Sequence, residues 1–540
     1  MSRILILGGY GGFGARLSRR LAARGHDILV AGRHLGKAAA FCDDLPNAMP
    51  VVADRDGDLG AVLAEHHPDL LIDAAGPFQG SGHHVVQACI DAQVHYLDLA
   101  DGRAFVAGIS MLDGAAKEAG VAVVSGASSV PALSGAVIRN LTIGMERVTA
   151  VEMAISASNR AAAGASVAAA ILSYAGKPLS LWRGARRFTS HGWQEMRRER
   201  FALRDGTALS HRLVALADVP DLDLLPGRLP GKPAVIFRAG TELAFQNLTL
   251  WMASWLVRWG WLGSLAGLAR WLLPLQRLTA GWGSDRSAMV VRVFGLVAGR
   301  RVERRWTLIA SDGDGPEIPT LAAEIIADRI AGMPHGAGDA GPLLDLADFE
   351  PSFTGLSIRH ESEEFEQRPA LYDRVMGVRF AALPLEVRAM HQVLRDGGAS
   401  GRATVERGRN PLARLIGALM RFPAAGEHTL HVGFREEHGV ERWTRTFSDQ
   451  AFHSNLCEES GQLVERFGPL RFRFDLPSDE QGLTMLMRGW SVLRLPLPLF
   501  LAPRTVAREW VEDGRFKFDV PIALPLIGPV IHYRGWLVPA

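Results

Sequence analysis

The chain has 540 residues, which at roughly 150 residues per domain predicts about three domains. Hydrophobic residues make up 48% and charged residues 21%, which excludes a disordered chain and favours a globular one with large cores. The formal net charge is only +2, so we predict no nucleic-acid partner. The three cysteines lie far apart and form neither a disulfide framework nor a Cys/His cluster, so we predict no metal site.

The N-terminal third alternates apolar runs with helical patterns. Residues 3–7 form the first run, and a glycine loop and a helical pattern over about 15–24 follow it. Further runs occur at 27–31, 51–53, 70–72, 95–97 and 121–124. Such alternation is typical of βαβ units and predicts an α/β domain over 1–135, with a doubly wound parallel sheet. The first run begins too close to Met1 for a signal peptide, so we expect a cytoplasmic protein.

After about residue 130 the strand-like runs become longer. They indicate an α+β substrate and oligomerisation domain with a mixed sheet over 136–358, and we expect a homo-oligomer. Residues 332–341 are rich in Gly, Ala and Pro and are predicted to be a connection, while the Glu-rich segment 359–368 is predicted to be a linker or a domain boundary. A helical pattern at 371–394 and recurring strand-like runs then predict a β-rich α+β domain over 368–540. Those runs lie at 429–436, 442–447, 470–476, 516–522 and 530–537.

The segment 248–275 holds five Trp among Leu, Ala and Gly, with Arg258 and Arg270 inside it. We interpret it as one or two helices broken near 260–263. A spanning helix needs about 20 predominantly apolar residues, which the arginines interrupt. Three alternatives remain for this segment. It packs in a core or domain interface, it is a membrane-surface segment or lipid-facing lid that makes a peripheral membrane contact, or it truly spans the membrane.

A glycine-rich loop follows the first run directly and opens a helical pattern. It contains GxGxxG as Gly9, Gly11 and Gly14. In this context the first glycine permits a tight turn, the second lets the backbone approach a pyrophosphate, and the third lets helix and strand pack closely. The loop therefore predicts a Rossmann-type dinucleotide site. Its residues are Gly8, Gly9, Tyr10, Gly11, Gly12, Phe13 and Gly14.

The end of the second run indicates which dinucleotide binds. An NAD-preferring site places an acid there, whereas this chain has Arg33 and His34, with Lys37 further on. Arginine can pair with a 2′-phosphate, so we predict that NADP (NADPH) is preferred over NAD. Asp54 is predicted either to hold the adenine amino group or to cap the next turn. The loop after the fourth run, with Ala75, Gly76, Pro77 and Phe78, is predicted to pass close to the cofactor's ribose and nicotinamide.

Together these motifs resemble the saccharopine dehydrogenase-like NADP-binding domain. The resemblance rests on the glycine loop, Ala31-Gly32-Arg33, the loop at 74–78, and the segments 85–89, 95–98 and 126–131. A looser likeness to uncharacterised oxidoreductases of this type and to trans-acting enoyl reductases extends to about 355. Residues 368–540 resemble DUF4166, a family of unknown function, through 371–373, 443–447 and 533–535. The resemblance implies hydride transfer to or from a nicotinamide cofactor.

The catalytic residues are unknown from the sequence. Weak candidates are Tyr96, Asp98, Asp101 and Ser128, which follow strands on the predicted cofactor side. The chain has Ala100-Asp101 where the family often has Gly-Glu, and Ala132 where it often has an acid, which argues against an amino-acid substrate. The apolar runs 493–501 and 520–529 are predicted to be core strands or the lining of a lipid-sized cavity.

We therefore expect an NADP-dependent oxidoreductase that acts on a small molecule, with an apolar or lipid-like enoyl or keto substrate favoured. The alternatives are a non-catalytic NADP-binding sensor or scaffold, and a lipid-binding protein with a vestigial Rossmann domain.

Overall fold

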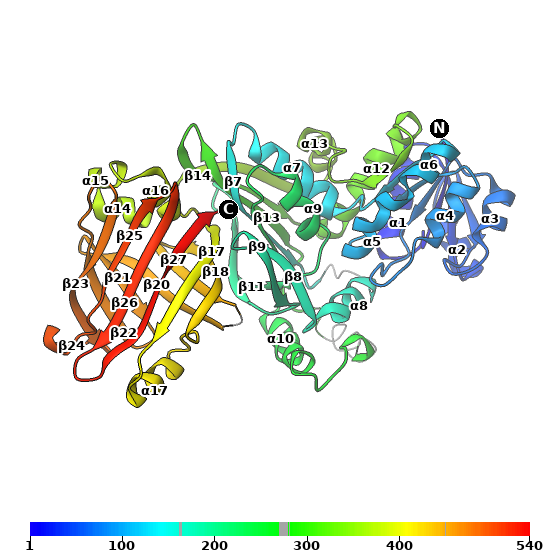
Figure 1. Ribbon diagram of the computed structural model, residues 1–540. Coiled ribbons are helices and arrows are strands. Elements are labelled where there is room, and N and C mark those ends of the chain that lie inside the picture. Colours follow the sequence, from blue (N-terminus) through cyan, green and yellow to red (C-terminus); the bar gives the residue numbers. More distant parts are fainter. Residues whose placement is uncertain (161–164, 269–278, 280, 449) are drawn as a thin grey trace.

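The computed structural model describes residues 1–160, 165–268, 279, 281–448 and 450–540, and it contains three large sheets (Figure 1). The N-terminal sheet, a central sheet and a C-terminal barrel follow one another along the molecule. The predicted fold class is confirmed: a Rossmann-type parallel sheet, a mixed sheet, and a C-terminal domain rich in antiparallel strands.

The N-terminal sheet is parallel and has the order β3-β2-β1-β4-β5-β6, with β15 added beside β6. Alternate residues of β1 pack in different cores, Ile4 and Ile6 in one and Leu5 and Leu7 in the other, because helices cover both faces. The strands are β1 (Arg3–Leu7), β2 (Asp27–Gly32), β3 (Ala48–Val52), β4 (Leu70–Asp73), β5 (His95–Asp98), β6 (Ala122–Ser125) and β15 (Gly336–Asp339). The helices are α1 (Gly12–Ala23), α2 (Leu35–Cys42), α3 (Leu59–His66), α4 (His84–Asp91), α5 (Arg103–Gly108) and α6 (Asp113–Ala119).

The chain returns to this domain after the central one. Helix α12 (Ile318–Arg329) packs on α1, where Glu324 pairs with Arg20 at 2.5 Å and with Arg24 at 2.6 Å. Strand β15 lies within 332–341, which we predicted to be a connection. That prediction is wrong because the Gly- and Ala-rich strand pairs through its backbone with β6 and gives no side-chain pattern.

The central sheet is mixed and has the order β10-β11-β12-β7-β13-β14-β16, with β7 and β12 parallel. Its edge strand β16 covers most of 359–368, so the linker alternative is wrong, whereas the boundary alternative agrees with β16 being the last strand of this sheet before the barrel. The glutamates belong to an exposed strand edge and face arginines, as in the Arg304–Glu364 pair at 2.8 Å. The strands are β7 (Arg147–Ala157), β10 (Arg197–Ala202), β11 (Ala208–Leu216), β12 (Ala234–Thr241), β13 (Ser287–Val297), β14 (Arg300–Ala310) and β16 (Ile358–Glu366).

Smaller elements surround the central sheet. Helices α7 (Ser134–Thr142), α9 (Asp221–Arg228) and α13 (Leu346–Thr354) contact β13, β12 and β16 respectively. The remaining elements are α8 (Ala165–Tyr174), the hairpin β8 (Pro178–Arg183) and β9 (Arg186–His191), and α10 (Ala244–Arg258).

Helix α10 accounts for the first part of the Trp-rich segment. It ends at Arg258, so the predicted break near 260–263 is confirmed, while 269–278 lies outside the described residues. Phe245, Leu248 and Met252 form an exposed apolar stripe on this helix, and Trp259 and Trp261 continue it. Within the described part of the chain, no helix has the length and apolarity that crossing a membrane requires.

The C-terminal domain is a closed antiparallel barrel. Strands β17 to β23 and β25 to β27 pair in chain order, and the pairs β22–β23 and β17–β27 close the ring. Three short helices cover one end, which confirms the helical pattern predicted at 371–394: α14 (Leu371–Met376), α15 (Val378–Ala381) and α16 (Leu385–His391). The strands are β17 (Asp396–Arg407), β18 (Gly426–Glu437), β19 (Val440–Phe447), β20 (Gln450–Glu459), β21 (Gln462–Phe467), β22 (Leu470–Asp475), β23 (Gly482–Val492), β24 (Leu495–Leu497), β25 (Val506–Glu512), β26 (Arg515–Leu524) and β27 (Gly528–Pro539).

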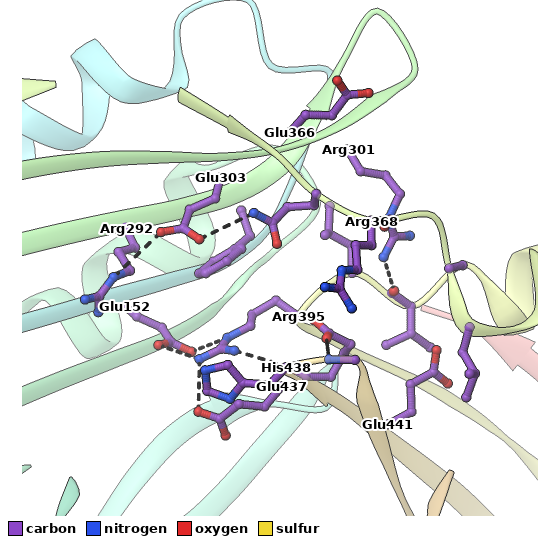
Figure 2. A pocket seen from close by; sticks show the side chains of 18 of the residues that line it. Glu152, Arg292, Arg301, Glu303, Glu366, Arg368, Arg395, Glu437, His438 and Glu441 are labelled. Atoms are coloured by element: carbon purple, nitrogen blue, oxygen red, sulfur yellow. Dashed lines mark hydrogen bonds and ion pairs between the residues drawn. The ribbon is translucent and has the colours of Figure 1, made fainter. Parts of the chain in front are cut away.

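A network of ion pairs joins the barrel to the central sheet (Figure 2). Glu152 on β7 is 2% exposed and pairs with Arg395 at 2.7 Å and with Arg197 at 3.1 Å. Burial alone would raise the pKa of Glu152, but the arginines hold it well below its usual range. A cavity of about 550 Å³ lies here, and several of its charged side chains already pair with one another, such as Arg292 with Glu199. We therefore regard it as a structural junction.

Candidate functional site

The glycine loop turns between β1 and α1 at the carboxyl edge of the parallel sheet. Gly8 has a φ of +71°, and the amide of Gly9 donates to the carbonyl of Ala31 at 3.2 Å, which ties the loop to β2. A Cβ on Gly14 would collide with the carbonyl oxygen of Gly8, whereas a Cβ on Gly11 would meet only that carbonyl group, at 3.0 Å. Gly14 therefore permits close packing of α1, and Gly11 leaves the outer side of the loop open.

The N-terminus of α1 fits an anion. It has no side-chain cap and no acidic residue in its first turn, and Gly11 and Gly12 are exposed. The free amides and the helix dipole at this end attract negative charge. The Ser18 hydroxyl donates to the carbonyl of Gly9 at 2.9 Å and holds the loop from behind. This geometry suits the pyrophosphate of a dinucleotide.

The predicted 2′-phosphate residues lie at the end of β2. Arg33, His34 and Lys37 are exposed, and among the described residues none has a side-chain partner. The Tyr10 ring packs against Gly32, and its oxygen accepts the amide hydrogen of His34 at 3.2 Å. The loop and Arg33 thus follow the carboxyl ends of the adjacent parallel strands β1 and β2.

Asp54 is exposed at the end of β3. Its Oδ1 accepts a hydrogen bond from the amide of Asp56 at 3.3 Å. This contact caps the turn, which is one of the two roles predicted for Asp54. Its role at the adenine stays a prediction.

An ion pair that sequence reasoning missed supports the loop after β4. Arg55 Nε pairs with the fully buried Asp73 at 2.8 Å, and its guanidinium lies 4.7 Å from the centre of the Phe78 ring. The Asp73 carboxylate also accepts the amide hydrogen of Ala75 at 3.0 Å. Burial raises the pKa of Asp73 although Arg55 opposes the shift. The pair fixes the shape of the 74–78 loop. Sequence patterns do not single out Arg55, because its partner Asp73 lies on another strand.

The structure places three of the weak catalytic candidates in or near packed regions. Tyr96 is fully buried in the core on one face of the sheet, and burial holds its pKa well above the usual range. Asp98 accepts hydrogen bonds from the amides of Ala100 at 2.9 Å and Gly126 at 2.7 Å. It therefore joins the ends of β5 and β6, and burial raises its pKa to about 6. Ser128 is 8% exposed. Their positions favour structural roles.

Asp101 differs from these three because it meets residues of the central domain. Its carboxylate accepts from Gln79 Nε2 at 3.0 Å, and burial together with nearby Asp218 raises its pKa. Burial and the two carboxylates likewise hold the pKa of Tyr174, at the end of α8, well above its usual range. Asp218 and Tyr174 were not predicted, because only the packing of the two domains brings them to Asp101.

Two contacts hold the central domain against this part of the Rossmann domain. Arg103 on α5 pairs with Asp223 at 2.6 Å and with Asp218 at 3.2 Å. The Ser166 hydroxyl on α8 donates to the carbonyl of Gly76 at 3.3 Å. The predicted nicotinamide loop and Asp101 therefore both lie where the two domains meet. A substrate domain placed against this edge is the usual arrangement for doubly wound folds.

Comparisons with known families match both ends of the chain. Residues 4–124 match the model described as saccharopine dehydrogenase NADP binding domain, and residues 383–537 match a domain of unknown function, DUF4166. No curated protein matches the chain. Apo saccharopine dehydrogenase (L-Glu forming) from Saccharomyces cerevisiae is similar in structure, with 14% identity, a TM-score of 0.46, and coverage of 67% of this chain and 100% of that one.

Two other solved structures are similar at lower scores. Amine dehydrogenase from Mycobacterium smegmatis has 13% identity and a TM-score of 0.38, and the match covers 64% of this chain and 96% of that one. GenD2 from gentamicin A biosynthesis, in complex with NAD, has 15% identity and a TM-score of 0.28, over 56% of this chain and 71% of that one. The chain is therefore similar to the saccharopine dehydrogenase NADP binding domain over 4–124 and to DUF4166 over 383–537.

Proposed function

We propose that the chain is an NADP-dependent oxidoreductase that transfers a hydride between NADPH and an apolar or lipid-like enoyl or keto substrate. One observation carries the proposal: the uncapped start of α1 and Arg33, which is exposed and unpaired within the described residues, follow the carboxyl ends of the adjacent parallel strands β1 and β2. When bound there, NADPH supplies the hydride from its nicotinamide ring.

The preference for NADP over NAD follows from charge at the end of β2. An NAD site needs a carboxylate there to accept from the ribose 2′-hydroxyl, whereas this chain presents Arg33 followed by His34. A guanidinium offers two parallel N–H donors to a 2′-phosphate, and Lys37 on α2 adds a point charge.

Reduction of an enoyl or keto group also needs a proton, and Asp101 is the best-placed donor. Its raised pKa keeps the carboxyl protonated to a higher pH than that of a surface aspartate. Gln79 fixes its orientation, and Asp218 disfavours its ionised form. Tyr174 keeps its proton across physiological pH and is a second hydrogen-bond donor near the same carboxyl group.

The apolar character of the proposed substrate rests on the central domain. A groove of about 630 Å³ beside α10 is lined by Trp251, Trp255 and Phe188 together with polar residues such as Gln194 and Arg258, so it suits a substrate with an apolar part and a polar group. The outer side of α10 exposes the stripe that begins at Phe245, and Trp261 beyond the helix is 73% exposed. Such a surface suits peripheral contact with a lipid surface, which we propose for the described part of 248–275.

NADPH titration followed by turnover tests the proposal. We expect saturable NADPH binding, and NADPH consumption with at least one enoyl or keto lipid. Asp101→Asn should keep NADPH affinity and lower kcat by about 10²-fold or more, the range for loss of a general acid. Asp56→Asn, at an exposed carboxylate, is the matched control. NADPH binding without turnover on any enoyl or keto lipid would favour the sensor alternative, and absence of NADPH binding would refute the proposal.

A further inference from the structure

The C-terminal barrel encloses a cavity of about 200 Å³ that is separate from the dinucleotide site. Phe, Met, Leu and Val side chains form most of its wall, among them Phe472, Met485 and Val520. Typical ligand pockets measure about 300–1,000 Å³, so this cavity suits a slim ligand. At about 30 Å³ for each water-sized group, it holds roughly seven methylenes. A single alkyl chain fits this space better than a ring system.

The charged groups in the wall are already paired. Arg445 Nη1 donates to the Ser454 hydroxyl at 2.9 Å, and Nη2 lies 3.4 Å from Glu465. Glu509 contacts the imidazole of His391 at 2.6 Å. Glu465 and Glu509 would repel an anionic head group inside the barrel. The cavity therefore favours the apolar end of an amphiphile.

The cavity reaches the end of the barrel opposite α14–α16 (Figure 1), because Ile416, Met420 and Pro503 from connections at that end line it, and we take this end as its mouth. Apart from the two-residue connections that follow β19 and β21, strand directions place three connections there: 408–425 with α17 (Pro411–Leu419), 493–505 and 525–527. Asn410 Nδ2 donates to the carbonyl of Ile527 at 3.1 Å, and Arg504 and Ala523 exchange backbone hydrogen bonds of 2.7 and 3.0 Å. The connections therefore form one continuous rim.

The inner and outer faces of α17 are both apolar. Ile416 and Met420 line the cavity, whereas Leu412, Leu415 and Leu419 point outward and are 56%, 59% and 75% exposed. Elsewhere on the rim, Leu499, Phe500 and Leu526 are also exposed. The run 493–501, predicted to be a core strand or a cavity lining, is therefore largely part of this exposed rim. Of the second predicted run, residues 520–524 lie on β26, where Val520, Ile522 and Leu524 line the cavity.

The rim is also cationic. Its three connections contain no Asp or Glu but five arginines, which are exposed and form no side-chain ion pair with a described residue: Arg409, Arg414, Arg421, Arg494 and Arg504. Exposed apolar residues beside unpaired cations are typical of surfaces that contact anionic lipids.

We propose that the barrel binds one anionic amphiphile, with a single acyl chain in the cavity and the head group at the rim arginines. A free fatty acid and one chain of an anionic membrane lipid share this chemistry. The proposal goes beyond hydride transfer and does not depend on it, because its readouts need no NADPH.

Binding of radiolabelled octanoate, the probe, to the full chain tests the cavity. We expect saturable binding of one probe per chain that unlabelled decanoate displaces. Thr505→Trp fills the cavity near the mouth, and Ala507→Phe fills it deeper; each should weaken binding at least tenfold, with the circular dichroism spectrum unchanged. No saturable binding, or binding that neither variant changes, would overturn the proposal.

The rim is tested with Leu419→Glu and the double variant Arg494→Glu/Arg504→Glu. Leu419→Glu removes apolar contact at the mouth, and the double variant opposes the anionic head group. Both should therefore weaken binding of the probe. Val378→Glu is the matched control, since Val378 is 91% exposed at the opposite end. Equal loss in the control and the rim variants would overturn the proposal.

Sedimentation with vesicles identifies the source of the acyl chain. Phosphatidylcholine vesicles with and without phosphatidylglycerol are compared for the native chain and for Leu419→Glu. If vesicle binding requires both phosphatidylglycerol and Leu419, the acyl chain comes from a membrane lipid. If the chain binds the probe but not vesicles, the acyl chain comes from a free fatty acid. Both results support the proposal, whereas a chain that binds neither the probe nor vesicles contradicts it.

Discussion

The Rossmann domain and the barrel bind ligands by different physical means. In the Rossmann domain the main chain approaches the proposed ligand, and positions such as Gly11 and Gly14 must lack a side chain. In the barrel the side chains of eight strands surround an apolar space that no single segment encloses. Substitution should therefore have a sharp effect on the first site and a gradual effect on the second. The ion-pair junction between the barrel and the central sheet should govern stability instead.

Loss of the buried pair at that junction should have the largest effect. Arg395→Met leaves Glu152, 2% exposed, with only part of its countercharge. Removing one partner of a buried ion pair typically costs about 3–5 kcal/mol. We expect a loss of that size in the free energy of unfolding, measured by urea denaturation. Arg402→Met, at an exposed position on β17, is the control. A loss below about 1 kcal/mol would show that the barrel folds independently of the central sheet.

Gly11→Trp should separate the two binding sites. The indole would occupy the open side of the glycine loop, so we expect NADPH affinity to fall at least a hundredfold, about 2.8 kcal/mol at 1.4 kcal/mol per tenfold. Binding of octanoate to the barrel should not change. Gly332→Trp is the control, because a Cβ there meets no atom within 4 Å. Unchanged NADPH affinity, measured by fluorescence titration, would refute the assignment of the loop.

The same contrast explains what the sequence could predict. The glycine loop and Arg33 are local features, and the apolar runs of β1 and β2 mark strands buried on both faces, so the Rossmann domain was predictable. Strand β16 resembled a linker because its glutamates are matched by arginines of β14, which the sequence does not show as neighbours. Asp218 and Tyr174 reach Asp101 only through domain packing.

The barrel shows the limit most clearly. Several of its strands were predicted one by one, but closure depends on pairing β17 with β27 and β22 with β23. The β17–β27 pair joins the two ends of the domain, and hydrophobic alternation within a strand does not specify its partner. The cavity and its mouth follow from that closure, so they became visible only in the structure.

Arg33→Ala should have a smaller and more selective effect than Gly11→Trp. The guanidinium is exposed and unpaired among the described residues, so its loss should leave the fold intact. A charge-assisted hydrogen bond to phosphate is worth about 1.5–3 kcal/mol, so NADPH affinity should fall roughly ten- to a hundredfold. NADH affinity should change less than twofold. Lys37→Ala is a useful comparison, since a point charge on α2 should contribute less. Equal losses for the two nucleotides would place the 2′-phosphate elsewhere.

The smallest effect concerns the pH dependence of the junction. Asp396 on β17 accepts the amide hydrogen of Gly184 at 2.6 Å, and burial raises its pKa from 3.8 to about 7. A carboxyl group with a raised pKa in the folded state contributes stability below pH 4, and that contribution is lost as pH rises through about 7. Asp396→Asn keeps an oxygen for Gly184 and cannot ionise. We expect it to raise the free energy of unfolding at pH 8 by on the order of 2 kcal/mol.

At pH 4 the same variant should leave stability nearly unchanged, because the native carboxyl group is then neutral as well. Urea denaturation at the two pH values measures the difference, and Asp56→Asn, at an exposed carboxylate, is the control that should show none. If Asp396→Asn destabilises the chain equally at both pH values, the carboxylate is ionised in the folded state. The nearby Arg183 and Arg435 would then stabilise its charge, and the junction would be held by charge throughout, unlike either binding site.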